Sequence, residues 1–351
     1  MPVYTQETLV SAADVQDLAR CAMRLPAEMG VRPSQARAPG ENALQSTDQS
    51  SVIDGGIPIY DVQGRLLFRD YVTVSEDGGE SRVRVAASKV FGIPIVSTMT
   101  RKATPVPWVE RAIGLLNGKR GTDTIVCHSY PRLGLLRTNG GEKWLVDFAG
   151  GPPLDVSPGS PGEASTWSLY DRVAQSEVNG NVAQWGVVAG QIRAAAVATP
   201  QVIVPGVPLE GQDCSNCCAP AVAAMILGFY HTANASEVRM RQLMRTDLLG
   251  PGTSPQDEEN AYRVAAPQFT IVRVNADWNA AVQEIAAGRP FKTGLNGAGS
   301  DHARAVVGYV DNAAVQVLIV NDPLPMDPDG GAVWREAWSS LLHTDFLFVR
   351  P

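Results

Sequence analysis

The sequence predicts an α+β fold in two parts, and three observations support this prediction. Its 351 residues are more than a single hydrophobic core usually supports, so two domains are expected. Short strand patterns separated by turn signals run from 57 to 148, whereas an apolar helical pattern at 217–231 is followed mainly by strands. A Pro- and Gly-rich stretch at 150–162 lies between them and is typical of a linker.

These patterns divide the chain into three segments. Residues 1–150 are expected to form a small, β-rich α+β domain, and 151–206 a Pro/Gly linker followed by a helical connector. Residues 207–351 are expected to form the main domain, in which a helix is followed by an antiparallel sheet in two layers.

The first segment begins with an amphipathic helix at 11–25, in which Ser11 and Asp14 complete a capping box. The polar stretch 31–56 follows, and its content of Pro, Gly, Ser and Gln indicates a loop. Strands are then expected at 57–60, 65–72, 81–87, 93–97, 124–130 and 142–148, with a short helix at about 107–117. The first two strands are expected to form a hairpin and the last two a strand pair.

The third segment is entered through an extended stretch between Pro200 and Pro208. Helices are expected at 217–231, 235–249 and 277–288, and strands at 269–274, 291–295, 302–310, 315–320 and 345–349. Residues 325–331 contain acidic side chains without the regular spacing of a calcium loop, so they are expected to form a turn.

Composition and charge exclude several classes of protein. The net charge is −7, and no cluster of lysine or arginine forms the basic surface that nucleic-acid binding requires. No run approaches the roughly 18 apolar residues of a membrane span, and the N-terminus has no secretory signal. Cytoplasmic residence is therefore the default expectation, with export by a route without a cleaved signal as the alternative. In that setting the five cysteines are expected to be reduced.

Three of these cysteines, Cys214, Cys217 and Cys218, lie at the start of the apolar helical pattern. A thiol at a helix N-terminus experiences the positive end of the helix dipole, which lowers its pKa. Six residues before Cys218, Gln212 could hold an oxyanion together with the backbone N–H of Cys218. The spacing of Cys214 and Cys217 also suits a metal, but a closed zinc site needs four ligands and the sequence has no second such pair. No metal is expected, and the absence of phosphate- and dinucleotide-binding motifs predicts no cofactor.

A base for such a thiolate is offered by His302, which follows a glycine-rich loop and opens a strand. Asn321 and Asp322 end the next strand, and either could fix the imidazole tautomer by accepting its other ring N–H. Because side chains alternate along a strand, only one of the two can face His302. Asp322 is favoured, with Asn321 as the alternative. The remaining histidines occupy less suitable positions in the sequence, namely His128, His231 and His343.

The region 207–323 resembles the papain-like cysteine peptidases, especially their compact bacterial branch, and is similar to the bacteriocin-processing peptidases. The resemblance rests on Gln212, Cys218-Ala219-Pro220-Ala221, His302 and Asn321-Asp322, which occur in the family's order. It implies a helix that carries the nucleophile and packs on an antiparallel sheet. It also implies roles for four residues, with Cys218 as nucleophile, His302 as base, Asp322 as orienting acid and Gln212 as oxyanion donor.

The sequence departs from the family at the two neighbours of the nucleophile, where Cys217 and Ala219 replace the usual tryptophans. Cys217 could form a disulfide, serve as an alternative nucleophile or simply fill space. In the plant-enzyme pattern Cys-x-x-Cys-Trp-Ala it would take the catalytic place. The offset from Gln212 and the Cys-x-Pro-Ala match favour Cys218.

The expected function is that of a cysteine peptidase, a hydrolase that cleaves peptide or protein substrates through a thiolate–imidazolium pair and an acyl-enzyme. The first domain loosely resembles a propeptide, so it is expected to cover the cleft until it is removed. Two alternatives remain open. One is an acyltransferase or amidase on the same fold, and the other is a catalytically silent module that binds peptides.

Overall fold

A computed structural model gives the fold of most of the chain. It describes residues 4–5, 8–28, 56–74, 79–102, 108–194, 201–233, 235–248, 252–294, 302–311, 316–324, 331–339 and 342–351. The loop expected at 31–56 and the turn expected at 325–331 lie outside these residues, apart from the last residue of each.

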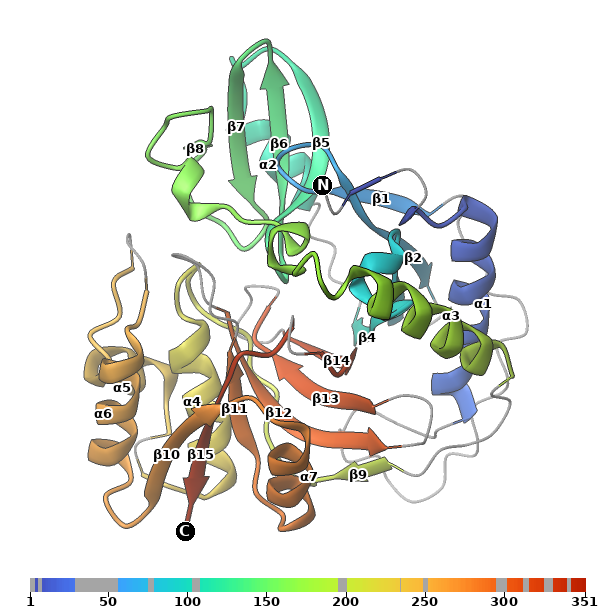
Figure 1. Ribbon diagram of the computed structural model, residues 1–351. Coiled ribbons are helices and arrows are strands. Elements are labelled where there is room, and N and C mark those ends of the chain that lie inside the picture. Colours follow the sequence, from blue (N-terminus) through green and yellow to red (C-terminus); the bar gives the residue numbers. More distant parts are fainter. Residues whose placement is uncertain are drawn as a thin grey trace.

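The N-terminal region contains most of the elements that its periodicity predicts (Figure 1). Its helices are α1 (Ala12–Glu28), α2 (Trp108–Leu115) and α3 (Val178–Ala194), with short 3-10 turns at Lys89–Phe91, Glu163–Ser165 and Leu169–Arg172. Its strands are β1 (Ile57–Tyr60), β2 (Leu66–Val74), β3 (Gly79–Ala86), β4 (Ile95–Lys102), β5 (Thr122–Ser129), β6 (Arg132–Asn139), β7 (Glu142–Asp147) and β8 (Leu154–Asp155). One half of the capping box expected at the start of α1 is present, because the Asp14 backbone N–H donates to Ser11 Oγ at 3.1 Å. The Ser11 hydroxyl in turn donates to the Asp14 carboxylate at 2.8 Å.

The C-terminal region follows the expected order of a buried helix and then mainly strands. Its helices are α4 (Cys218–Phe229), α5 (Glu237–Leu243), α6 (Pro255–Ala265) and α7 (Trp278–Ala286). Its strands are β9 (Gln201–Ile203), β10 (Thr270–Asn275), β11 (Phe291–Gly294), β12 (Ala303–Asp311), β13 (Gln316–Asp322), β14 (Ala332–Ala337) and β15 (Asp345–Arg350).

The expected strand pair at 124–130 and 142–148 is wrong, because β6 lies between β5 and β7 and pairs with both. The sequence pattern of β6 does not indicate a strand, since Gly134 lies within it and glycine weakens a strand pattern. The structure requires glycine there: a Cβ on Gly134 would lie 2.6 Å from the carbonyl oxygen of Val146. Part of the expected linker is also a strand, since β8 pairs with β7.

A single 15-stranded sheet runs through both regions of the described chain, so the fold is mixed α/β (Figure 1). The strands follow the order β10-β15-β11-β12-β13-β14-β4-β3-β2-β1-β5-β6-β7-β8, and β9 pairs with β12. The regions meet where β14 pairs antiparallel with β4, from Val333–Thr100 to Glu336–Ser97. Sequence analysis missed β14, because charged residues interrupt its apolar pattern.

A network of buried charges lies at this junction. Glu336 on β14 is 1% exposed, pairs with Arg304 of β12 at 2.6 Å and accepts a hydrogen bond from the Tyr130 hydroxyl of the N-terminal region. Arg84 on β3 pairs with Asp70 at 2.9 Å and is as fully buried. Buried charges are tolerated only when they are paired, and each of these ion pairs lies within one region. The hydrogen bond from Tyr130 to Glu336 crosses between the two regions.

The helix α4 is the centre of the C-terminal core. Every residue from Ala219 to Leu227 is buried, and the helix packs against β11 and β12. The helix α7 packs against β12 and β9. Since β12 lies under α4 and β13 is its neighbour, the start of the helix is held near the ends of both strands.

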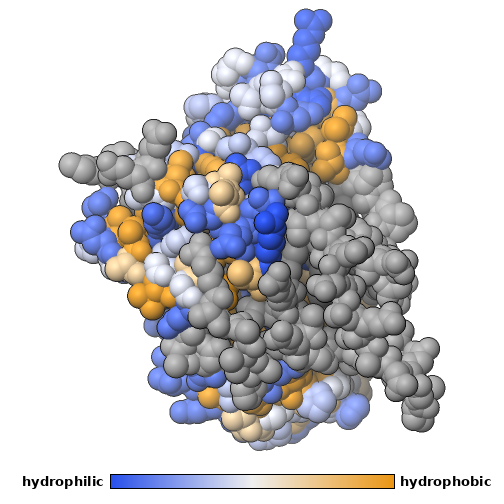
Figure 2. Space-filling view, turned by 90° about the vertical axis from the view of Figure 1, so that its right-hand side faces the viewer, coloured by the Kyte–Doolittle hydropathy of each residue, from blue (hydrophilic) through white to orange (hydrophobic). Residues whose placement is uncertain are grey.

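The outer surface on the side shown in Figure 2 is mixed in polarity. Hydrophobic residues on the coloured part of this face form several small groups separated by hydrophilic ones. Within the described ranges, no helix combines the length and the apolar character that crossing a membrane requires.

Candidate active site

Cys218 is the first residue of α4 and is partly exposed. The residue before it, Cys217, caps the helix without a side-chain hydrogen bond, and Pro220 occupies the first turn, where a proline costs no helical hydrogen bond. The helix begins here because the buried run that follows is apolar throughout. The thiol therefore lies where the helix dipole favours a negative charge.

His302 and Asp322 form a buried pair beside this thiol. His302 precedes β12, Asp322 ends β13, and each is 2% exposed. The distance from His302 Nε2 to Asp322 Oδ1 is 2.7 Å, and the Leu324 backbone N–H donates to the same carboxylate oxygen at 2.9 Å. His302 also hydrogen-bonds to the Cys218 thiol, so the imidazole connects the thiol with the carboxylate.

The surroundings of the pair favour its charged form. Burial lowers the pKa of His302, but the charge and hydrogen bond of Asp322, followed by the interaction with Cys218, outweigh it and raise the pKa to about 9. Burial raises the pKa of the Cys218 thiol, but His302, the Ala303 backbone and Arg132 together lower it below its ordinary value. These surroundings thus favour a thiolate next to an imidazolium over the neutral pair.

Asn321, the alternative orienting residue, lies on the opposite face of β13. Its side-chain Nδ2–H donates to the Pro208 carbonyl at 3.1 Å, which anchors the chain that leads to the cysteine cluster. The structure therefore brings Asp322, and not Asn321, to His302, as the alternation along a strand requires.

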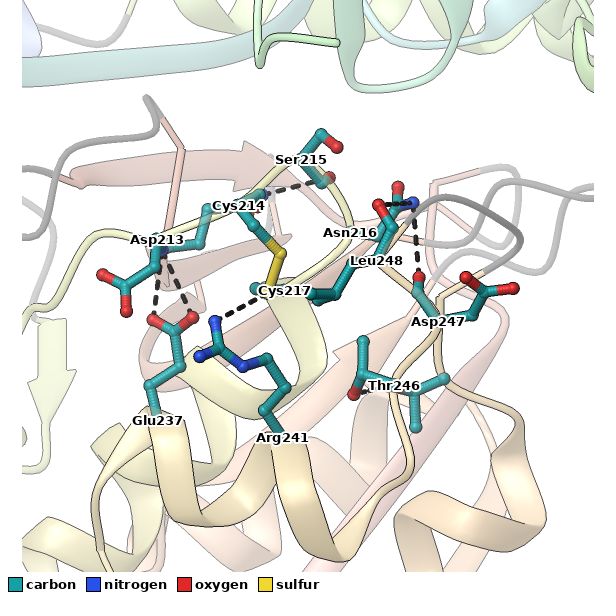
Figure 3. Close-up of a disulfide and its surroundings, with 12 residues drawn as sticks. Asp213, Cys214, Ser215, Asn216, Cys217, Glu237, Arg241, Thr246, Asp247 and Leu248 are labelled. Atoms are coloured by element: carbon teal, nitrogen blue, oxygen red, sulfur yellow. Dashed lines mark hydrogen bonds between the residues drawn. A yellow bond between two sulfur atoms is a disulfide. The ribbon is translucent and has the colours of Figure 1, made fainter.

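Cys214 and Cys217 form a disulfide, so the expectation of reduced cysteines does not hold for these two (Figure 3). Their spacing allows it because the chain turns between them, with the Cys217 N–H donating to the Cys214 carbonyl at 3.2 Å. Both sulfurs are used in this bond, which leaves Cys217 neither a thiolate nor a metal ligand. Of the three possibilities that the sequence leaves open for Cys217, the structure shows the disulfide.

The loop that contains the disulfide is held on both sides by polar contacts (Figure 3). The Asp213 backbone N–H donates to both carboxylate oxygens of Glu237 at 3.2 Å. On the other side, Asn216 Nδ2–H donates to the Leu248 carbonyl at 3.3 Å. Arg241 approaches the Cys217 sulfur at 3.9 Å.

Gln212, the expected oxyanion donor, is buried under this loop with 1% of its surface exposed. Its Nε2 donates to the carbonyls of Cys214 at 2.5 Å and Ser215 at 3.2 Å. Its backbone N–H donates to the Pro323 carbonyl, next to Asp322, at 3.0 Å. In this structure the side-chain amide of Gln212 thus fixes the loop that precedes Cys218.

Cys218 and His302 open into a cavity of about 670 Å³ whose opposite wall comes from the N-terminal region. That wall includes His128, Arg132 and Asp147, from β5, β6 and β7. Asp147 pairs with Arg132 at 2.5 Å and with His128 at 3.1 Å. Sequence reasoning missed this wall, because its residues belong to separate strands and form no motif.

A second charged group lines the cavity within the C-terminal region. Lys292 Nζ lies 3.1 Å from Asp345 and 3.4 Å from Glu258, and Arg273 pairs with Glu258 at 2.6 Å. No group of three or more potential metal ligands was found among the residues that the structure describes.

A family model matches the segment of the chain that contains the candidate site. Residues 204–340 match the model of the family described as Peptidase_C39 like, and this segment contains Cys218, His302 and Asp322. No curated protein matches the chain. The match over residues 204–340 supports the expected similarity of this segment to the papain-like cysteine peptidases.

Proposed function

We propose that the protein is an active cysteine peptidase with Cys218 as nucleophile, His302 as general base and acid, and Asp322 as the residue that orients His302. The observation that supports this most strongly is the position of His302, which is hydrogen-bonded to Asp322 at 2.7 Å and to the thiol of Cys218. A nucleophile, a base and an orienting group in contact are the arrangement that covalent acyl transfer requires.

The proposed reaction has two halves. The Cys218 thiolate attacks the carbonyl carbon of a peptide bond, and the His302 imidazolium gives its proton to the leaving amine, which leaves a thioester. His302, now neutral, removes a proton from water, and the resulting hydroxide attacks the thioester. The acid product leaves and the thiolate–imidazolium pair is restored.

The oxyanion of each tetrahedral intermediate needs hydrogen-bond donors. We propose the backbone N–H of Cys218, since amides in a first helical turn have no carbonyl partner within the helix. Gln212 contributes in this proposal only after its amide leaves the carbonyls of Cys214 and Ser215, to which it donates in the structure.

We do not propose that the N-terminal region is a removable cover. The pairing of β4 with β14 and the contact of Tyr130 with Glu336 support a permanent association of the two regions. The same region lines the cavity next to Cys218, where a substrate would bind.

The proposal is tested by labelling with a thiol-reactive electrophile at about pH 5.5, where an ordinary thiol is almost fully protonated. We expect rapid labelling of Cys218, located by mass spectrometry, and its loss in His302→Ala. Cys127 is an internal control, because burial raises the pKa of its thiol to about 12. Slow and equal labelling of Cys21, Cys127 and Cys218 would contradict the proposal.

A second arm identifies the reaction. Incubation with a peptide library, with and without an added amine, distinguishes hydrolysis from acyl transfer to the amine. We expect hydrolysis products that disappear in Cys218→Ala. Products that contain mainly the added amine would indicate an acyltransferase, and fast labelling without any product would indicate a module that binds peptides.

A further inference from the structure

We infer that Arg132 of the N-terminal region determines substrate specificity by binding a carboxylate of the substrate beside the bond that Cys218 attacks. This inference rests on the proposed peptidase function and adds the chemical class of its substrates. It assigns to the N-terminal region a part in substrate binding.

The position of Arg132 is the first argument. It begins β6, and the cavity that it lines is the one into which Cys218 and His302 open. Its charge contributes to the lowered pKa of the Cys218 thiol, so the guanidinium lies within electrostatic reach of the sulfur. A group bound by Arg132 would therefore lie near the reacting atoms.

The guanidinium is held in place from behind. Asp147, at the end of β7, accepts from Arg132 at 2.5 Å, from His128 Nε2 at 3.1 Å and from the Ala149 backbone N–H at 2.7 Å. Burial raises the pKa of Asp147, but the charges of Arg132 and His128 and its hydrogen bonds lower it well below the ordinary range. The carboxylate thus stays ionised. It fixes the side chain of Arg132 by a contact between two strands.

The hydrogen-bonding capacity of Arg132 is the second argument. A guanidinium has five N–H donors, and in the described part of the chain the contact recorded for Arg132 is the one from its terminal nitrogen to Asp147. Its side chain is 15% exposed, so the remaining donors can reach a ligand in the cavity. An arginine with spare donors in a fork geometry suits a carboxylate.

The two other basic side chains that line the cavity, Arg273 and Lys292, each have several carboxylate partners within the described chain, whereas Arg132 has one there. Arg273 donates to Glu258, to Glu259 and to Asp345, and Lys292 lies between Glu258 and Asp345. Among the described residues of this lining, Arg132 is therefore the cation that retains capacity for an external anion.

Two kinds of peptide carry a carboxylate close to a scissile bond. One has an acidic side chain next to it, and the other has its C-terminal carboxylate there. Both would use the same bidentate contact, so the inference names the carboxylate, and the experiment separates its source.

The experiment uses the full-length protein and matched peptides that differ only by Glu or Gln near the scissile bond, each made with a free and with an amidated C-terminus. We measure kcat/KM and the peptide concentration that protects Cys218 from the electrophile. In the unmodified protein, kcat/KM for a carboxylate-bearing peptide should exceed that for its neutral partner by about 10-fold or more. This is the size of effect expected of a charge-assisted hydrogen bond. A Glu-over-Gln preference would identify a side-chain carboxylate, and an acid-over-amide preference a C-terminal one.

Two variants and a control test the residue itself. Arg132→Gln should bring the preference close to one, and Asp147→Asn should weaken it, because Arg132 then loses the carboxylate that fixes its side chain. The control is Arg111→Gln, which removes the same charge from an exposed position on α2 of the same region and should leave the preference unchanged.

Two results would overturn the inference. One is the absence of any carboxylate preference in the unmodified protein, in both cleavage and protection. The other is an equal loss for acidic and neutral peptides in Arg132→Gln, which would limit Arg132 to an effect on the thiol. Failure of the proposed function is distinguishable, since it would remove cleavage and low-pH labelling, whereas protection of Cys218 from the electrophile at about pH 9, where ordinary thiols also react, would still report binding.

Discussion

Asn321 and Asp322 are neighbours at the end of β13 with different tasks. Asn321 holds the entering chain at Pro208, and Asp322 holds the imidazole of His302. Both arrangements follow from the alternation of side chains along a strand. The sequence could therefore predict that one of the two faces His302, and the acidic residue was the one favoured.

Replacing Asp322 by Asn should move the alkaline limit of peptidase activity to lower pH. The pKa of His302 is about 9 because the charge of Asp322 outweighs the effect of burial, so the imidazolium persists below that pH. Without that charge the imidazolium loses its main stabilisation, and the limit moves towards the ordinary histidine value of about 6.5. The pH profile of kcat/KM measures the shift.

The control for this change is Asp311→Asn, an exposed carboxyl at the end of β12, which should leave the profile unchanged. An alkaline limit that stays near its original pH in Asp322→Asn would show that another group sets it.

The contacts of other residues at the site could not be predicted from the sequence, because they depend on how distant segments fold together. The partner of Cys217 depends on how the loop turns, and the sequence left three possibilities open for this residue. The contacts of Gln212 depend on which carbonyls face it once the loop is closed. Arg132 and Asp147 come from different strands, so their meeting is a property of the sheet.

At the scale of elements, the disulfide closes the loop that enters α4. A cross-link over so short a loop stabilises a fold by about 2 kcal/mol, because it restricts the unfolded chain. We expect the double variant Cys214→Ser, Cys217→Ser to lose roughly this free energy of unfolding in denaturant titrations. Cys218 should still be labelled at low pH, because His302 and Asp322 are unchanged.

Cys21→Ala is the comparison, since it removes a thiol that is not in a disulfide. A loss of labelling at Cys218 in the double variant, at full folding, would show that the disulfide also positions the nucleophile.

Long and strongly periodic elements were predictable, and interrupted ones were not. The helix α4 is apolar over every buried position, and β12 and β13 carry long apolar runs. In contrast, β6 contains a glycine required by close strand approach, and β14 contains charges that are paired only in the folded sheet. The partners of those charges come from distant parts of the chain, so the local sequence pattern does not predict them.

At the scale of the whole molecule, Glu336 joins the two regions by accepting a hydrogen bond from Tyr130, while its charge pairs with Arg304 within the C-terminal region. Glu336→Gln should reduce the free energy of unfolding by roughly 3–5 kcal/mol, because it leaves the charge of Arg304 buried without a partner. Denaturant titration of the full chain measures the loss. Glu142→Gln, at an exposed position of β7, should change stability by less than about 0.5 kcal/mol.

Removal of the N-terminal region should reduce activity, in contrast to the behaviour of a propeptide. A chain of residues 201–351 keeps β9 on β12 but exposes the edge of β14 and withdraws Tyr130 from Glu336. Exposed strand edges promote aggregation. We expect lower solubility and slower peptide cleavage than in the full chain, both measured on freshly purified samples. Equal or higher activity of the shortened chain would restore the idea of a removable cover.

The pairing of β4 with β14 also determines when the sheet can be completed during synthesis of the chain. On the ribosome, β4 is made early, whereas β14 emerges only after the nucleophile helix and most of the C-terminal strands. During that interval β1, β2 and β3 can already associate, but the free side of β4 has no partner within the nascent chain. Such an edge can capture strands of neighbouring chains. A chaperone that shields the free edge of β4 should therefore raise the yield of folded protein, and slower translation, which prolongs the exposure of that edge, should lower it.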